Sequence, residues 1–142
     1  MKIRRIEASP VEEERRKALL LRHIGPRWVS SFEQLLSQWM KRLSCHYSGD
    51  YWDYFELSNG GFYLAPLATN KTFLMASPNF ARENVSADAA GIIVTMLALT
   101  ELMGIVDCKG DGSLDSYVER YCALRDFAIE HNEREKIFSI IY

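Results

Sequence analysis

Apolar side chains recur at every third or fourth position between residues 30 and 43. This spacing places them on one face of a helix, because an α-helix has about 3.6 residues per turn. Ser30 and Glu33 are spaced as the two partners of a capping box. The sequence predicts an amphipathic helix that packs on the core. The residues of its apolar face are Phe32, Leu35, Leu36, Trp39, Met40 and Leu43.

An earlier helix is predicted to run from Ser9 to Gly25. Ser9 has the side chain of an N-cap, and Pro10 suits the first helical position. In residues 12–17, glutamates precede arginine or lysine by four positions, as on a solvated helix surface. Gly25-Pro26 is interpreted as the end of this helix.

The period changes to two in the middle of the chain. Residues 51–57 are rich in aromatic side chains, which favours a strand. Residues 58–61 contain an Asn-Gly pair, the strongest short hairpin signal, and residues 62–65 form the returning strand. Residues 72–76 supply a third strand. Because hairpins join these strands, the sequence predicts an antiparallel meander.

Helical patterns return in the last third of the chain. Ser86 is the expected N-cap of a helix that is apolar on nearly every side, central, buried and ended by Gly104. Residues 114–128 give a further amphipathic helix. A last short helix follows. Asn132 and Glu135 are its expected cap, and its expected inward-facing residues are Ile137, Phe138 and Ile141. The prediction is a single α+β domain over residues 1–142, with about five helices around a small antiparallel meander.

The charge balance excludes two classes of nucleic-acid-related protein. The 142 residues include 17 Lys+Arg and 19 Asp+Glu, which gives a formal net charge of −2. A basic protein that binds DNA mainly through phosphates needs a clear excess of positive charge. A protein that imitates DNA needs a large excess of carboxylates. The sequence fits neither, so strong nucleic-acid binding is not expected.

The cysteines and the apolar stretches predict a cytoplasmic protein. Cys45, Cys108 and Cys122 are odd in number and form no C-x-x-C, which favours free, buried thiols in a reducing compartment. The first residues lack the apolar stretch of a secretory signal. The longest uncharged apolar stretch, Ala89–Thr100, is shorter than the roughly 20 residues of a membrane span.

The search for catalytic, cofactor and metal motifs finds none. The three histidines are far apart, and Cys45-His46 are neighbours that point in different directions on a helix. A calcium loop starting at Asp107 fails, because Lys109 and Val118 stand where oxygen ligands are required. Phosphate-binding and nucleophile motifs are absent from the sequence. We therefore predict no catalytic residue, cofactor or metal, and a small hydrolase with an unrecognised site is the weakest hypothesis.

The aromatic hairpin is the most unusual local feature. Trp52, Tyr54 and Glu56 share one face of the first strand. Packing of both faces inside the core is the commonest role for such side chains, and a protein interface is the second. Base stacking is the third, and it lacks a basic groove here. If the protein acts through one surface, the candidate residues are Trp52, Tyr54 and Glu56 of the strand, Asn59 of the turn, and Arg22, just before Gly25-Pro26. Asn59 and Gly60 also fit turn positions with positive φ.

Three segments resemble signatures of the ArdB/KlcA antirestriction family. Tyr51-Trp52 followed by ELSNGGFYLAP at 56–66 is similar to that family's YW…LSNGGFYMAP. SADAAGI at 86–92 is similar to its LSADAAGI helix start, and LRDFA at 124–128 with Glu130-His131 is similar to its ALRDFAAEHPE. The resemblance covers roughly residues 18–142. The chain differs at Leu64, where the family often has Met, and at Asn132, where Pro is expected.

The resemblance implies a function as well as a fold. Such proteins are carried on plasmids, prophages and genomic islands, and they protect incoming unmodified DNA from type I restriction enzymes of the host. They are not DNA mimics and have no associated catalytic residue or cofactor, and residues 1–17 correspond to a variable segment. We therefore expect an antirestriction protein that binds a protein, either the type I restriction complex or a host factor controlling it. A DNA-binding protein that shields restriction sites is the alternative.

Overall fold

The computed structural model describes residues 5–44, 47, 51–67, 72–110 and 112–142, and this part of the chain contains five α-helices and two small sheets. The helices are α1 (Arg16–His23), α2 (Val29–Leu43), α3 (Ala87–Lys109), α4 (Leu114–Glu130) and α5 (Arg134–Ile141). The strands are β1 (Ala8–Pro10), β2 (Trp52–Leu57), β3 (Phe62–Pro66), β4 (Thr72–Ala76) and β5 (Arg82–Ser86). The α+β class is confirmed.

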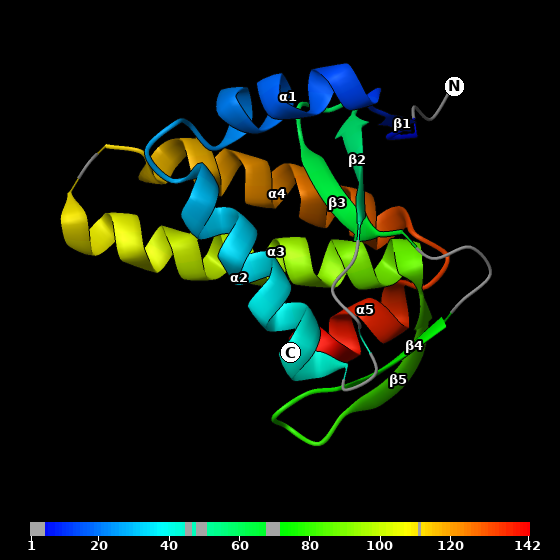
Figure 1. Ribbon diagram of the computed structural model, residues 1–142. Helices are drawn as coiled ribbons and strands as arrows, with labels where there is room; N and C mark the ends of the chain where they lie inside the picture. Colours follow the sequence, from blue (N-terminus) through cyan, green and yellow to red (C-terminus); the bar gives the residue numbers. More distant parts are fainter. Residues whose placement is uncertain (1–4, 45–46, 48–50, 68–71, 111) are drawn as a thin grey trace.

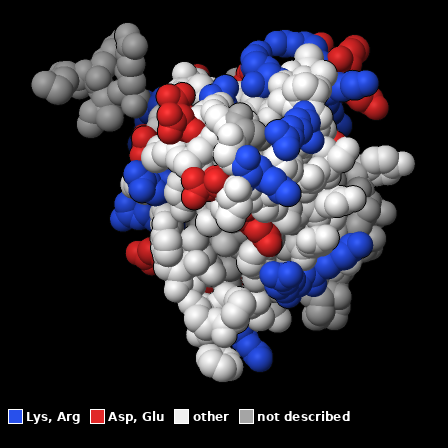
Figure 2. Space-filling model, turned by 90° about the vertical axis from the view of Figure 1, so that its left-hand side faces the viewer, with Lys and Arg blue, Asp and Glu red and all other residues white. Residues whose placement is uncertain are grey.

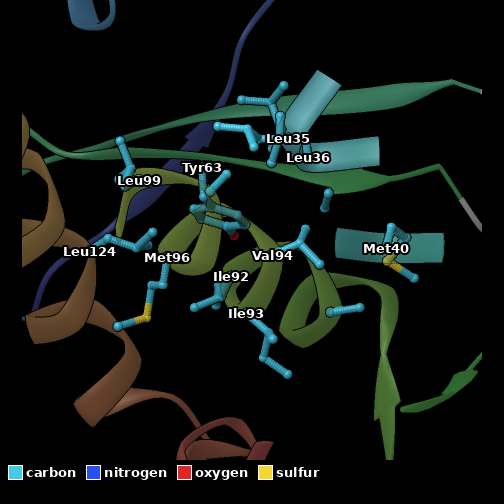
Figure 3. Packing of buried hydrophobic residues seen from close by; sticks show 14 of the residues in the cluster. Leu35, Leu36, Met40, Tyr63, Ile92, Ile93, Val94, Met96, Leu99 and Leu124 are labelled. Carbon is cyan, nitrogen blue, oxygen red and sulfur yellow. The ribbon is translucent and has the colours of Figure 1, made fainter. Parts of the chain in front are cut away.

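Helix α3 is the centre of the core. It runs through the middle of the molecule and contacts α2, α4, α5 and β3 (Figure 1). Its buried side chains meet Leu35, Leu36 and Met40 of α2 and Leu124 of α4 (Figure 3). By length and composition α3 could cross a membrane, but two thirds of its most apolar stretch is buried inside the fold. It therefore fits the core helix of a globular domain.

The ends of α3 test two sequence expectations. The Ser86 side chain accepts a hydrogen bond from the Ala89 N–H, which confirms the expected N-cap. The expected end at Gly104 is wrong, because the helix continues to Lys109 and stops at Gly110. Gly110 has φ +63°, the left-handed conformation that ends a helix and favours glycine.

Helix α3 approaches the backbone of β3 closely. A Cβ on Gly91 would lie 2.5 Å from the Cα and 2.6 Å from the Cβ of Ala65, so only glycine fits there. One turn later, the Thr95 hydroxyl lies 3.2 Å from the Leu64 N–H and 3.3 Å from the Leu64 carbonyl. These bonds satisfy backbone groups of β3, which is an edge strand. This contact packs strand β3 and its sheet against the central helix α3.

The strands form two sheets, so the single meander is wrong. The first has the order β1-β2-β3, and the second consists of β4 and β5. All pairings are antiparallel, as expected, but β4 pairs with the unforeseen β5 instead of β3. The expected helix start at Ser9 is also wrong, because residues 8–10 pair with 55–57 of β2. Pro10 is tolerated because β1 is an edge strand, and a 3-10 turn (Glu13–Arg15) leads into α1.

The other helices follow their patterns, although the predicted caps do not. Five residues of the α2 stripe are buried, while Trp39 is half-buried and donates to Glu101 of α3 at 2.8 Å. Ser30 lies inside α2, so the capping box is wrong. Likewise, Glu133 and not Asn132 precedes α5, where Ile137 and Ile140 are the buried residues. Phe138 and Ile141 are half-buried, because the short helix lies at the edge of the core.

The thiols differ from the expectation. Cys108 is exposed and Cys122 is partly buried, and both are free, so the prediction of buried thiols is wrong for Cys108. It lies in the last turn of α3, where that helix extends beyond the core. Cys45 and the neighbouring His46 lie outside the described residues.

Candidate interaction site

Arg22 and Glu56, two of the expected surface residues, form an ion pair between α1 and β2. The Arg22 side chain is 56% exposed and that of Glu56 is 34% exposed. Such a pair is worth little in free energy because water screens it. The ion pair does hold the two charges side by side on the surface, so a binding partner would meet both of them together.

Trp52 and Tyr54 are half-buried and pack against the core. The guanidinium of Arg16 lies 5.2 Å from the centre of the Tyr54 ring, and the Tyr47 ring meets Trp52 edge-on at 5.9 Å. Burial and the charge of Glu33 raise the pKa of Tyr54, against the opposing effect of Arg16. This face of β2 is therefore partly covered by α1 and partly exposed to solvent. A role of Trp52 and Tyr54 in binding stays a prediction.

Asn59 joins the hairpin turn to α4. Its side-chain amide donates to the Ala123 carbonyl at 2.8 Å, and its oxygen accepts from the Gly61 N–H at 3.2 Å. Within the described residues of this turn, the positive φ falls on Gly60 (91°) and not on Asn59. These bonds give Asn59 a structural role whether or not it touches a partner.

A cluster that sequence reasoning missed joins Tyr63, Asp88 and His131. The Tyr63 hydroxyl donates to one carboxylate oxygen of Asp88 at 2.6 Å, and His131 Nε2 lies 2.9 Å from the other. The Glu133 N–H donates to His131 Nδ1 at 3.0 Å. Nδ1 is therefore the acceptor, and the ring proton lies on Nε2, facing Asp88.

This cluster holds a fixed negative charge. Burial acts to raise the pKa of Asp88, but the hydrogen bonds from His131 and Tyr63 outweigh it and lower the pKa. Burial and the nearby Asp88 charge raise the pKa of Tyr63. At neutral pH the carboxylate is ionised and the phenol is protonated. Among the described residues, the structure pairs Asp88 with no lysine or arginine.

A shallow hollow of about 270 Å³ opens beside Asp88. Phe55 and Asp53 of β2, Pro66 at the end of β3 and the neighbouring Leu67 line it together with Asp88. The Asp53 carboxylate lies 3.4 Å from the guanidinium of Arg16. Phe55, Tyr63 and Phe127 stack beneath this region, with ring centres 4.9 and 5.6 Å apart. The lining of the hollow therefore combines apolar side chains with two carboxylates.

The polar groups of this cluster are bonded to one another within the fold. A general acid or base needs a pKa near the working pH and a free position toward a substrate. Asp88 has a lowered pKa, and both ring nitrogens of His131 are engaged. No group of three His, Cys, Asp or Glu side chains able to hold a metal is found among the described residues. What the cluster offers chemically is a positioned anion.

A second histidine is buried on the other side of the first sheet. His23 stacks on Phe62 with ring centres 4.6 Å apart, and Arg120 Nε donates to its Nδ1 at 3.1 Å. Burial, helped by the charges of Arg120 and Arg22, lowers the pKa of His23 to about 4. This imidazole is neutral at physiological pH.

The cluster joins the three segments that carry the family resemblance. Tyr63 lies in the first, Asp88 in the second and His131 in the third. Asn59 also links the first segment to α4, which carries part of the third. The spacing of the residues gave no signal, because 25 and 43 positions separate the bonded pairs. Their shared membership of the motifs was the signal that could have found them.

The comparisons with known proteins agree with this resemblance. A family model described as "Antirestriction protein" matches residues 45–142. The chain belongs to the antirestriction protein family. Antirestriction protein KlcA of Escherichia coli is 39% identical over 96% of this chain and 94% of its own length. An uncharacterized protein of E. coli K12, YfjX, is 31% identical over 96% of this chain and 88% of its own length.

A solved structure of an antirestriction protein has the same fold. It is 36% identical, covers 100% of both chains and superposes with a TM-score of 0.87. That work describes KlcA and ArdB as having a novel fold and antirestriction activity against type I DNA restriction systems in vivo but not in vitro. The membership of this chain in the ArdB/KlcA group is therefore confirmed by sequence and by structure.

Proposed function

We propose that this protein protects incoming unmodified DNA of a mobile element from the type I restriction enzymes of its host. It acts in the cytoplasm, without catalysis, through contact with a protein. The likeness to KlcA and ArdB over the whole chain carries the proposal, since those proteins have antirestriction activity against type I systems.

The contrast between activity in vivo and its absence in vitro supports a protein partner found in the cell. A direct inhibitor of the purified enzyme, or a protein that covers DNA, needs nothing beyond the purified components. A protein that binds a host factor, or a cellular state of the restriction complex, needs the cell. The activity described for KlcA and ArdB fits the second kind of protein.

The charge distribution favours a protein partner over DNA. The formal net charge is −2, and on the face in Figure 2 lysine and arginine are interspersed with aspartate and glutamate. Binding to DNA phosphates requires a surface of clustered positive charge. The alternative, a DNA-binding protein that shields sites, predicts a gel shift at low salt that weakens steeply as salt rises.

The chemistry of the Asp88 cluster supports a non-catalytic role. Its carboxylate is kept ionised and its tyrosine protonated, and both nitrogens of His131 hold hydrogen bonds. A reaction at this place would require breaking the bonds that join three parts of the fold.

The function is tested by transforming a host that carries a type I restriction system with two forms of one plasmid. The unmodified plasmid should transform poorly without this protein and well with it. The fully modified plasmid should transform equally well in both strains. No gain for the unmodified plasmid, with soluble protein detected in the cells, would contradict the proposal.

A further inference from the structure

The hollow beside Asp88 combines a partly exposed carboxylate with apolar and aromatic side chains. Asp88 lies in the first turn of α3, and its side chain is 41% exposed despite the bonds from Tyr63 and His131. A carboxylate offers about four acceptor positions. Among the described residues, Tyr63 and His131 each use one of these positions, one on each carboxylate oxygen.

Among the described residues, no lysine or arginine pairs with Asp88. His131 Nε2 bonds one carboxylate oxygen of Asp88, while its Nδ1 accepts the Glu133 N–H. Asp53 adds a second carboxylate, 40% exposed, although Arg16 already lies beside it. A cation that enters the hollow is attracted by two partly exposed carboxylates, Asp88 and Asp53.

The rim of the hollow is apolar. Leu67, which lines the hollow, is 55% exposed, and its N–H donates to the carbonyl of the neighbouring Tyr51, which is 76% exposed. Phe55 presents an aromatic ring to the interior of the hollow. Exposed apolar patches mark protein interaction sites, and aromatic side chains are enriched in protein interfaces.

We infer that this hollow, formed by Asp53, Phe55, Leu67 and Asp88, receives an arginine side chain of the protein that the chain binds. The inference rests on the proposed function, because it names the chemistry of that partner. The planar guanidinium donates two parallel hydrogen bonds to a carboxylate. Its face also packs on aromatic and aliphatic groups, which a lysine ammonium does less well.

Other ligands fit the hollow less well. A phosphate would meet the negative charges of Asp88 and Asp53. A cofactor-sized molecule is usually bound in a cleft that encloses most of its surface, while this hollow is shallow. A single arginine side chain matches the size and the charge of the hollow. The backbone of the partner that carries it lies beside Leu67 at the rim.

The inference is tested first by binding of a defined probe. The peptide acetyl-Leu-Arg-Leu-amide is titrated into the labelled protein and followed by the backbone amide signals of residues 53, 67, 87 and 88. The matched peptide contains citrulline, which has the shape of arginine without its charge. We expect saturable shifts at these four amides for the arginine peptide, and at least a tenfold weaker response for citrulline.

Two variants of the same helix complete this test. Asp88→Asn removes the charge from the hollow, and Asp107→Asn removes an exposed charge about 28 Å away along α3. Asp88→Asn should abolish the shifts, and Asp107→Asn should leave them unchanged. Equal responses to arginine and citrulline, or shifts that survive Asp88→Asn, would overturn the inference.

A second test introduces a competing cation without disturbing the core. Leu67→Lys places an ammonium at the rim, and Leu67→Glu removes the same apolar group without adding positive charge. Leu74→Lys is the matched control, since Leu74 of β4 is 54% exposed against 55% for Leu67. We expect Leu67→Lys to reduce protection of the unmodified plasmid at least tenfold and Leu67→Glu to reduce it less, while Leu74→Lys should leave it within twofold of wild type.

The two proposals fail in different ways. If wild type protects no plasmid but binds the arginine peptide at residues 53–88, the proposed function is wrong and the binding site stands. If wild type protects the plasmid and Leu67→Lys protects it equally, the inference about the hollow is wrong and the proposed function stands.

Discussion

Asp88 and His131 lie 43 positions apart and meet across 2.9 Å, carboxylate oxygen to imidazole nitrogen. Tyr63 reaches the same carboxylate from β3. This cluster ties β3, the first turn of α3 and the segment before α5 to one anion. Tyr63, Asp88 and His131, which lie far apart in the sequence, thereby form one hydrogen-bonded cluster.

The Tyr63 hydroxyl should contribute measurably to stability. Tyr63→Phe keeps the ring stacked between Phe55 and Phe127 but removes a donor to an ionised carboxylate. We expect the free energy of unfolding in urea to fall by about 1–3 kcal/mol. Tyr121→Phe is the control, because its hydroxyl bonds Tyr142 on the exposed surface, and it should change that free energy by less than ~0.5 kcal/mol. Equal effects of the two variants would show that Tyr63 does not support the cluster.

Two glycines of α3 should respond oppositely to alanine. Gly91→Ala places a methyl group against the backbone of Ala65, so the helix must move away from β3 and the protein should lose about 1–3 kcal/mol or more. Gly104→Ala meets nothing within 4 Å and should gain up to about 1 kcal/mol from helix propensity. Thermal melting of both variants measures the difference. A stable Gly91→Ala would disprove the close contact between α3 and β3.

Stability should fall in mild acid because of His23. Its pKa is lowered to about 4 in the folded protein, against 6.5 as the ordinary value. Between these two pH values the unfolded chain binds the proton and the folded chain does not. The contribution of His23 is therefore complete above pH 6.5, is lost progressively toward pH 4, and amounts to a few kcal/mol at most. An NMR titration of the His23 ring checks the cause, and a midpoint near 6.5 would contradict it.

The Arg22–Glu56 pair allows stability and binding to be separated. Arg22→Glu and Glu56→Arg each place like charges together, and the double variant restores the ion pair with its direction reversed. We expect the double variant to regain the melting temperature of the wild type. If this surface contacts a partner, protection against restriction should stay low in the double variant. Full protection there would remove Arg22 and Glu56 from the candidate interaction surface.

Local sequence patterns predicted most of the helices and the hairpin, because the signals for those elements lie within a few residues. The stripe of α2 and the Ser86 cap are examples. The pairing of residues 8–10 with β2 depends on contacts almost 50 positions away, and it overrode the local helix signal at Ser9 and Pro10. The partner of β4 was missed because Arg82–Ser86 has little of the apolar alternation of a strand.

The candidate site was harder to predict than the fold for the same reason. The aromatic strand was noticed from its composition, but the sequence does not say which of its faces α1 covers. Asp88 was interpreted only as a favourable charge at a helix start, and His131 as an isolated histidine. Their bond forms only when α3 and α4 fold back on each other, and nothing in the residue spacing encodes that contact.

Phage plating efficiency on a host with an active type I restriction system tests the central claim most directly. Unmodified phage is plated with and without expression of this protein, and a host with a type II system serves as the comparison. The account predicts that the phage plates far better with the protein on the type I host and equally poorly on the type II host. Unchanged plating on the type I host, with soluble protein confirmed in the cells, would contradict it.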